Sequence, residues 1–286
     1  MATLSKKKNR RCGLKSTKHT RRNKVAGTRK GGVMQYFGFP WDRQSCWMDS
    51  SLMAMFYPDA TYATIYPYIE KMNASPSMHD IMPALTQVIS ELRTPGIAPS
   101  LHGIRSLFAK HFAEKRSASE DQRDAFQVEN ELGYVFYFVQ ELLHVMGVPP
   151  VTMSRGRSTR NQWILEIEKC GDDTPLEECL QQNYAGWKIK SDMTYLFIEL
   201  VGDTVKPQEF IQFNGKAWKL TSMVVFDCSH FISYLKQDGQ WYLYDDTRSM
   251  SHIGLEPYKF GQSYTKGSCR FQYGRENTFF FYVLDE

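Results

Sequence analysis

The apolar pattern of this 286-residue sequence changes near its middle, and that change limits the folds available to it. Up to about residue 147, apolar residues recur at the three- and four-residue spacing of helices. The four segments with this spacing are 46–57, 78–93, 100–113 and 131–146. After about residue 193, the apolar residues occur instead in short runs of β-branched and aromatic side chains, which are separated by turns. These runs are 194–200, 222–226, 230–235, 240–244 and 278–284. The sequence therefore predicts an α+β fold, in which a helical N-terminal part packs against one mostly antiparallel sheet.

A strongly basic segment precedes these patterns. Residues 1–32 contain twelve Lys and Arg and no Asp or Glu, which leaves 23 basic residues against 31 acidic ones in the rest of the chain. Such a segment cannot bury enough apolar surface to fold alone, and it attracts polyanions through the release of counterions. We expect a disordered basic tail that serves in nuclear import, in binding nucleic acid or an acidic partner, or only as a solubilising extension.

The folded domain is expected to occupy residues 33–286, since the chain is 42% hydrophobic and has enough apolar side chains for a substantial core. By pattern it divides into a helical part over 33–150, a loop-rich part over 151–192 and a sheet-forming part over 193–286. Two hydrophilic stretches without apolar periodicity, 117–124 and 154–161, are expected to be exposed loops.

Two further features of the sequence indicate an intracellular protein. No apolar run approaches the length needed to span a bilayer, and no apolar segment follows the basic N-terminus as it would in a signal peptide. The six cysteines form no Cys-x-x-Cys pair, so we expect neither a zinc ribbon nor a disulfide framework. The expected location is the cytoplasm or nucleus, with no membrane association and with the cysteines as thiols.

One of these cysteines, Cys46, stands at the start of an apolar helical segment, directly after Ser45, a residue type that caps helix N-termini. The apolar positions that follow fall on one helical face, which would bury the helix and leave its first turn presenting the thiol; they are Met48, Leu52, Met55 and Phe56. The thiolate is the reactive form of cysteine, and a helix N-terminus or a nearby imidazole lowers the pKa of the thiol. Taken alone, such a cysteine is usually structural, so a catalytic role requires a partner.

His230 and two aspartates supply candidates for that partner. His230 opens one predicted strand, and Asp238-Gly239 predicts a tight turn into the next strand because both residues tolerate positive φ angles. A two-residue turn makes Asp245 a diagonal neighbour of His230 on the same face, and a four-residue loop places the two directly opposite. In both registers Asp246 points away, whereas a three-residue loop would exchange the two aspartates. Asp245 is therefore the expected partner that orients the imidazole, and Asp246 is the second candidate.

These residues resemble the ubiquitin-specific proteases, papain-like cysteine peptidases that remove ubiquitin. The similar segments occur in the family's order and cover nearly all of residues 33–286. They are Ser45–Ser50, which resembles the cysteine box; Leu176–Leu180, similar to a Leu-Glu-x-x-Leu segment; Ser229–Phe231, similar to Gly-His-Tyr; Trp241–Asp246, similar to Trp-Tyr-x-Phe-Asp-Asp; and Thr278–Leu284, which resembles the closing strand. The compact size and the basic tail resemble members encoded by large DNA viruses.

The resemblance implies a papain-like fold, with a helical thumb against a palm sheet and with reduced, metal-free fingers because the family's zinc-binding Cys pairs are absent. It implies that Cys46 is the nucleophile, His230 the general base and Asp245 its orienting acid, with no cofactor. A narrow aromatic cleft for the substrate tail would place Phe231 and Trp241 in substrate binding.

The sequence departs from the family at two positions near these residues. The usual glycine before the histidine is Ser229, and the usual asparagine five residues before the cysteine, an oxyanion-hole donor, is Trp41. Gln44 or the backbone N–H of Cys46 is the candidate replacement donor, because acyl transfer requires donors near the developing oxyanion.

The expected function is that of a thiol-dependent deubiquitinase, which cleaves the bond after the C-terminal glycine of ubiquitin and has ubiquitin or a ubiquitin-like protein as its partner. Two alternatives stay open. One is a papain-like protease for a ubiquitin-like modifier or a viral polypeptide. The other is an inactive structural or binding protein that keeps the fold and acts through its basic, nucleic-acid-binding tail.

Overall fold

The computed structural model of the chain describes residues 38–39, 45–72, 80–116, 135–168, 170–171, 174–190, 192–201, 205–227, 230–247, 255–262, 264–266, 269–271, 274 and 278–285. These residues belong to one compact unit that spans Met34–Glu286. The basic segment 1–32 and the predicted loop 117–124 lie outside the described residues. Within the described part of the chain, no helix combines the length and the apolar character needed to cross a membrane.

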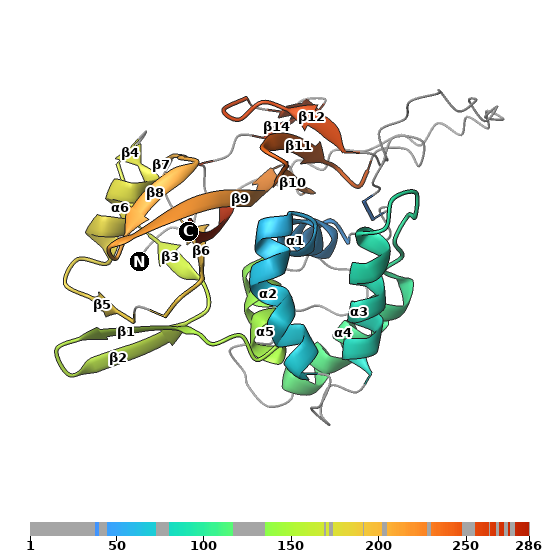
Figure 1. Cartoon of the computed structure of the whole chain (residues 1–286), viewed down its shortest axis with the longest axis horizontal. Coiled ribbons are helices and arrows are strands. Elements are labelled where there is room, and N and C mark those ends of the chain that lie inside the picture. The colour runs from blue at the N-terminus through green and yellow to red at the C-terminus, as the bar shows by residue number, and fades with distance from the viewer. Residues whose placement is uncertain are drawn as a thin grey trace, which may run out of the picture. The chain divides into compact units, whose positions relative to one another are not determined.

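Helices occupy the first half of the described chain, as the apolar spacing predicts (Figure 1). They are α1 (Cys46–Phe56), α2 (Asp59–Met72), α3 (Ile81–Leu92), α4 (His102–Arg116) and α5 (Val135–Val145). Of these, α2 is not predicted from the sequence, because Pro58 precedes it and Pro67 lies inside it, and proline usually interrupts a helix. A sixth helix, α6 (Leu176–Asn183), follows in the second half.

One eight-stranded sheet forms most of the second half. Its strands are β3 (Leu165–Ile167), β6 (Tyr195–Leu200), β8 (Phe210–Phe213), β9 (Lys216–Asp227), β10 (His230–Gln237), β11 (Gln240–Tyr244), β12 (Glu256–Tyr258) and β15 (Thr278–Leu284). The order is β12-β11-β10-β9-β15-β6-β3, with β8 also paired to β9. Every pair is antiparallel except β3 with β6, so the predicted mostly antiparallel sheet is present.

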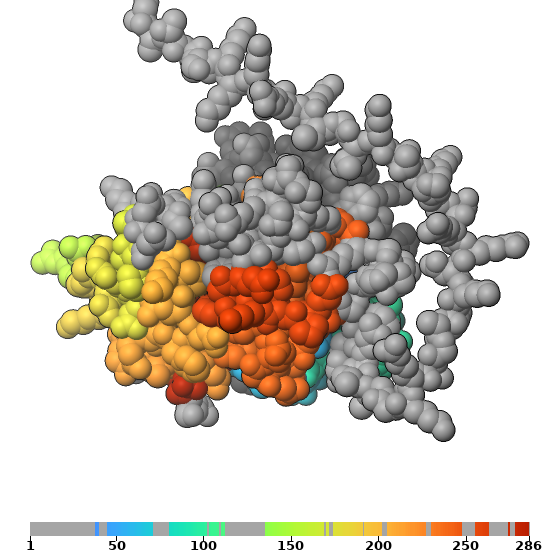
Figure 2. Space-filling model, turned by 90° about the horizontal axis from the view of Figure 1, so that it is seen from above, coloured from blue at the N-terminus to red at the C-terminus, as the bar shows by residue number. Residues whose placement is uncertain are grey.

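The segment 151–192, expected to be rich in loops, contains further regular elements. A hairpin joins β1 (Val151–Arg155) to β2 (Ser158–Gln162), and β5 (Lys188–Ile189) extends it. The segment 154–161 is exposed as predicted, but it is a hairpin and not a loop: both faces of β2 lie toward solvent, so the strand lacks the apolar alternation that would identify it. The remaining short strands are β4 (Thr174–Pro175), paired with β7 (Val205–Lys206), and β13 (Tyr264–Lys266), paired with β14 (Cys269–Phe271). Figure 2 shows the surface over α6 and β8, in yellow to light orange, beside that of β11 and β12, in red-orange.

A disulfide joins Cys170 to Cys179, the latter on α6, which corrects the expectation that these cysteines are thiols. Their Cα atoms lie 5.4 Å apart, because the chain turns back through β4 before α6 begins. The nine-residue separation has no recognisable cysteine spacing, so the sequence does not signal the pair. Among the described cysteines, Cys46 is free.

The sheet is buried on both faces. On β15, Phe279 and Phe281 belong to one hydrophobic cluster with the five N-terminal helices, whereas Phe280 and Tyr282 belong to a second cluster on the other face. This division follows from the two-residue alternation of side chains along a strand. Burying a side chain of this size contributes roughly 1.5–3 kcal/mol, so the two clusters together hold the helices and α6 on the sheet.

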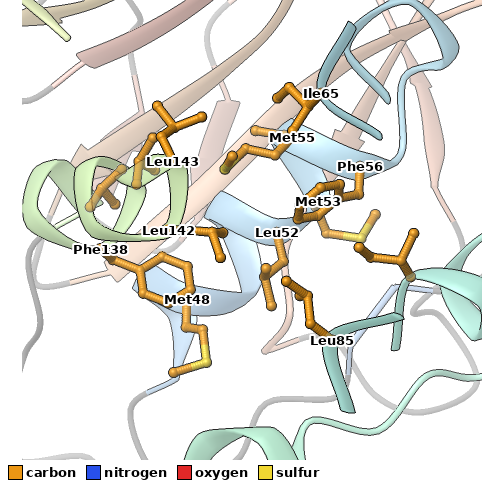
Figure 3. Packing of buried hydrophobic residues seen from close by; sticks show 14 of the residues in the cluster. Met48, Leu52, Met53, Met55, Phe56, Ile65, Leu85, Phe138, Leu142 and Leu143 are labelled. Atoms are coloured by element: carbon orange, nitrogen blue, oxygen red, sulfur yellow. The ribbon is translucent and has the colours of Figure 1, made fainter. Parts of the chain in front are cut away.

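Helix α1 lies inside the first cluster, where Met48, Leu52 and Leu142 pack closely (Figure 3). All of its residues except Trp47 are buried, so it is buried on all sides rather than on the one face that its apolar positions predict. Hydroxyl groups of the sheet bind it: Ser222 on β9 donates to the carbonyl oxygen of Ala54 at 2.7 Å, and Ser233 on β10 donates to that of Ser50 at 2.9 Å. These bonds fix α1, and with it Cys46, against β9 and β10.

The hairpin between β10 and β11 adopts the two-residue turn. Gln237 pairs with Gln240, and Asp238 and Gly239 have φ angles of 51° and 76°. Positive φ at both central residues is the requirement of a type I′ turn, which matches the twist of a hairpin. The structure therefore has the two-residue turn, the register from which Asp245 is predicted to be a diagonal neighbour of His230, although the paired residues end at Tyr244.

Among the described side chains of the sheet strands, one acidic side chain is buried, and it makes the stability of the protein depend on pH. Glu199 on β6 is 9% exposed and pairs in register with Glu166 on β3. Burial, with a further contribution from the charge of Glu166, raises the pKa of Glu199 from 4.5 to about 8. Because its pKa is raised in the folded state, this residue contributes stability that is present below about pH 4.5 and is lost as the pH rises through about 8.

We predict that Glu199→Gln removes much of the loss of stability between pH 5 and pH 9. The glutamine cannot ionise, so at pH 9 the variant should exceed the parent by about 3 kcal/mol in free energy of unfolding. Denaturant unfolding at both pH values measures this difference. The matched control is Glu178→Gln on the exposed face of α6, which should leave the pH dependence unchanged. Equal pH dependence in the parent and in Glu199→Gln would contradict the prediction.

Candidate active site

The candidate nucleophile Cys46 begins α1 and faces the start of β10. Its side chain is buried, with the residue 2% exposed, and its sulfur accepts a hydrogen bond from the backbone N–H of Phe231. Ser45 precedes the helix as predicted, but its hydroxyl does not cap a backbone N–H; it donates to Asp49 Oδ2 at 2.6 Å. The structure thus places the thiol beside the residue that follows His230.

The electrostatic setting of Cys46 differs from the sequence expectation. Burial raises the pKa of its thiol from 9.0 to about 12, and the carboxylates of Asp246 and Asp49 add to this increase. The N–H groups of Phe231 and Trp47 act in the opposite direction but do not offset it. In this conformation the thiol is therefore neutral at physiological pH, and a thiolate would form only if a base accepted the proton as the sulfur reacts.

His230 opens β10 and lies against Asp245. Its Nε2 atom is 2.9 Å from Asp245 Oδ1, and the carboxylate is buried. The same oxygen accepts hydrogen bonds from the backbone N–H of Thr247 at 3.1 Å and from its hydroxyl at 2.7 Å. A carboxylate held in place by several donors fixes the orientation of an imidazole that donates to it.

Asp246 does not point away, which corrects the prediction from strand alternation. It is 1% exposed, and its Oδ1 atom lies 3.6 Å from His230 Nε2. The reason is that β11 ends at Tyr244, so the alternation of faces does not extend to the turn that holds both aspartates. Both carboxylates consequently lie near the imidazole, with Asp245 the closer one.

Asp49 is a further residue of this site that the sequence analysis does not identify. It is fully buried on α1, and its side chain is hydrogen-bonded to that of Asp246. Its pKa is raised well above 3.8, chiefly by burial and then by the charge of Asp246 and this hydrogen bond, against the opposing effects of Ser45 and Arg105. A signal was available, because an aspartate within an apolar helix is rarely buried without a partner.

The donor atoms of His230, Asp245 and Asp246 all lie within 4.8 Å of one another. The imidazole nitrogen and the Asp245 oxygen already hydrogen-bond to each other. This is the arrangement of an imidazole oriented by a carboxylate, and we infer no metal role from it.

The chain that leads toward Cys46 is anchored on the last residue of β11. The hydroxyl of Tyr244 donates to the carbonyl oxygen of Phe39 at 2.8 Å, and both residues are buried. Gly38 lies against the Tyr244 ring so closely that a Cβ atom there would overlap it. Tyr244 therefore connects residues 38–39, which precede α1, to the turn that holds Asp245. The candidate oxyanion donor Gln44, and the departures Trp41 and Ser229, lie outside the described residues.

We predict that Gly38→Ala disturbs the site. The added methyl group must displace the buried Tyr244 ring, so we expect a loss of about 1–3 kcal/mol in the free energy of unfolding. Thermal unfolding measures this loss. The matched control is Gly103→Ala on α4, where a Cβ meets no atom within 4 Å and the helix should be stabilised slightly. Equal changes in the stability of the two variants would contradict this account of Gly38.

Phe231 and Trp241, the residues expected to line a substrate cleft, are both buried. Phe231 packs against Phe226 in the helix-facing cluster, with ring centroids 4.5 Å apart. Trp241 belongs to the cluster on the other face of the sheet, and its Nε1 donates to Glu209 at 3.2 Å. In this structure the two rings pack as core side chains on opposite faces rather than lining one cleft.

No protein-family model matches the sequence, and no curated protein sequence matches it either. Solved structures do match. One is the SAGA Ubp8/Sgf11/Sus1/Sgf73 DUB module bound to ubiquitin aldehyde, with a TM-score of 0.59 and 12% identity over 91% of this chain and 72% of that one. The same module in another structure gives a TM-score of 0.53 and 13% identity, over 91% and 70% of the two chains.

A third similar structure is an essential yeast splicing factor, with a TM-score of 0.55 and 9% identity over 89% of this chain and 71% of that one. At such identities the likeness concerns the fold alone. Because the fold occurs both in a deubiquitinating module and in a splicing factor, it does not by itself establish an activity. The comparisons thus support a mixed α/β fold that resembles that of a ubiquitin protease.

Proposed function

We propose that this chain is a thiol-dependent deubiquitinase that cleaves the bond after the C-terminal glycine of ubiquitin. The observation that carries the proposal is the contact between the start of α1 and the start of β10. There, Cys46 accepts a hydrogen bond from the N–H of Phe231, and the neighbouring His230 is hydrogen-bonded to the buried Asp245. The fold adds support, since one similar structure is a DUB module bound to ubiquitin aldehyde.

In the proposed mechanism, Cys46 Sγ attacks the carbonyl carbon after the last glycine of ubiquitin. Because Nε2 of His230 is engaged by Asp245, the thiol proton passes to Nδ1. The tetrahedral intermediate then collapses, and the imidazolium gives its proton to the leaving amine. Water activated by the same imidazole hydrolyses the thioester, which releases ubiquitin and restores the thiol. The backbone N–H of Cys46 and the side chain of Gln44 are the proposed donors to the oxyanion.

Burial of the thiol adds a requirement to this mechanism. Cys46 is 2% exposed, so the substrate tail reaches its sulfur only after the covering side chains move. This movement couples substrate binding to activation, because water remains excluded from the thiol until a substrate arrives.

The experiment that tests the proposal measures hydrolysis of a fluorogenic C-terminal amide of ubiquitin alongside the same amides of ubiquitin-like modifiers. Turnover of the ubiquitin amide supports the proposal. Turnover of another modifier alone would instead support a papain-like protease for that modifier or for a viral polypeptide. Absence of turnover on all of them would favour an inactive binding protein, the alternative that the likeness to a splicing factor keeps open.

The basic tail is proposed to act separately from the catalytic domain. We predict that deletion of residues 1–32 leaves turnover of a small ubiquitin amide nearly unchanged but removes salt-sensitive binding to nucleic acid, because twelve positive charges are lost. Titration of labelled RNA and DNA at several salt concentrations measures the second effect. If the full-length protein shows no salt-dependent binding, the tail serves nuclear import or a protein partner instead.

A further inference from the structure

Two buried carboxyl groups lie against each other beside the candidate nucleophile. Asp49 follows Cys46 by three residues on α1, so the two side chains share one side of the helix. Asp246 reaches the same place from the turn after β11. The two aspartates are 0% and 1% exposed, and their side chains are hydrogen-bonded to each other.

The donors around Asp49 do not account for this hydrogen bond. Ser45 donates to Oδ2 of Asp49, whereas none of the described groups donates to Oδ1. Two ionised carboxylates have only acceptors, so a bond between them requires a proton on one side chain. The Oδ1 atom of Asp49 is the position at which that proton would lie.

We propose that Asp49 and Asp246 share one proton, and that Asp49 is a positioning residue which holds Asp246 against the imidazole of His230. Two carboxylates in contact and out of water cannot both be ionised at moderate cost, because their repulsion adds to the loss of hydration. The raised pKa of Asp49 agrees with this arrangement. The role in catalysis rests on the proposed function, whereas the sharing of the proton does not.

Other titratable and charged groups among the described residues act on the pair, and one of these described groups is a permanent cation. They are Cys46 on α1, Arg105 on α4, His230 on β10, and Tyr244 and Asp245 at the end of β11. The charge of Arg105 favours ionisation of Asp49, but burial and Asp246 outweigh it. The pair therefore carries one negative charge until the pH rises far enough to remove the shared proton.

Loss of the shared proton would have two consequences. The two like charges would repel each other, which displaces the first turn of α1 and with it the thiol of Cys46. It would also release Asp246, whose Oδ1 atom lies 3.6 Å from His230 Nε2. The site should therefore lose both stability and activity on the alkaline side, for a reason that lies outside the catalytic cysteine and histidine.

Thermal unfolding of the full-length protein between pH 6 and pH 9.5 tests this proposal without relying on activity. The folded-state pKa of Asp49 is raised, so the stability that its proton provides is present at low pH and is lost as the pH rises through that value. Asp49→Asn keeps a donor toward Asp246 but cannot ionise, so it should lose less stability than the parent over this range. Comparison at equal pH removes the contribution of Glu199, which is common to both proteins.

Turnover supplies the second measurement. Asp49→Ala removes the carboxyl group that bonds to Asp246 and should reduce kcat/KM by about tenfold to a hundredfold. Asp49→Asn should restore much of this loss and move the alkaline limb of the pH profile to higher pH. If the parent and Asp49→Asn lose stability alike as the pH rises, the shared proton does not exist. If the stability contrast holds while no protein hydrolyses ubiquitin amides, the acid pair stands and the proposed function fails.

Discussion

Replacing Cys46 by alanine is expected to abolish hydrolysis of a ubiquitin C-terminal amide, with a fall in kcat on the order of 10⁶-fold. The variant lacks the sulfur that attacks the carbonyl, and the described side chains of Cys170 and Cys179 are joined in a disulfide. Because alanine removes only one atom from a buried position, the variant should fold and still bind ubiquitin. Turnover, thermal unfolding and calorimetric binding of ubiquitin measure these three properties.

The matched control for this substitution is Cys12→Ala in the basic tail, which also removes one thiol and should retain full turnover. Equal turnover in Cys46→Ala and the parent would show that the activity does not use this cysteine. Loss of turnover in Cys12→Ala would show that a second thiol takes part.

Substitution of Asp245 by asparagine is expected to reduce kcat by about 10⁴-fold, as loss of the orienting carboxylate does in a serine-protease triad. The carboxylate accepts a hydrogen bond from Nε2 of His230, which leaves Nδ1 to take the thiol proton. An asparagine amide can donate to Nε2 instead, and this favours the tautomer in which Nδ1 already carries a proton. Turnover of the ubiquitin amide measures the loss.

Asp246→Asn is the contrast for that prediction. Its oxygen lies 3.6 Å from His230 Nε2, beyond normal hydrogen-bond distance, and the asparagine would still pair with Asp49. We therefore expect a smaller loss than for Asp245→Asn. A larger loss for Asp246→Asn would show that the more distant carboxylate orients the imidazole during the reaction.

The neighbourhood of His230 and Asp245 is predictable from the sequence because local chemistry fixes the hairpin. Asp238-Gly239 accepts the positive φ angles of a two-residue turn, and this turn sets the register of both strands. The helical first half and the antiparallel sheet are predictable for a similar reason, since each pattern repeats over many residues. The family resemblance added an assignment of roles, because the candidate cysteine, histidine and aspartate occur along the chain in the family's order.

Other features depend on contacts that no local pattern records. The position of Asp246 follows from the end of β11 at Tyr244, and the high pKa of Cys46 follows from burial among residues of distant elements. The hairpin of β1 and β2 is missed because its outer strand has two exposed faces. Helix α2 is missed because packing against its neighbours outweighs the unfavourable Pro67.

The central claim, that Cys46 is the nucleophile of a deubiquitinase, is tested most directly by a ubiquitin probe with a C-terminal electrophile. The account predicts one covalent adduct per chain, with peptide mass spectrometry locating the ubiquitin remnant on Cys46, and no adduct in Cys46→Ala. An adduct on another cysteine, or none with ubiquitin under conditions that label a known deubiquitinase, would contradict it.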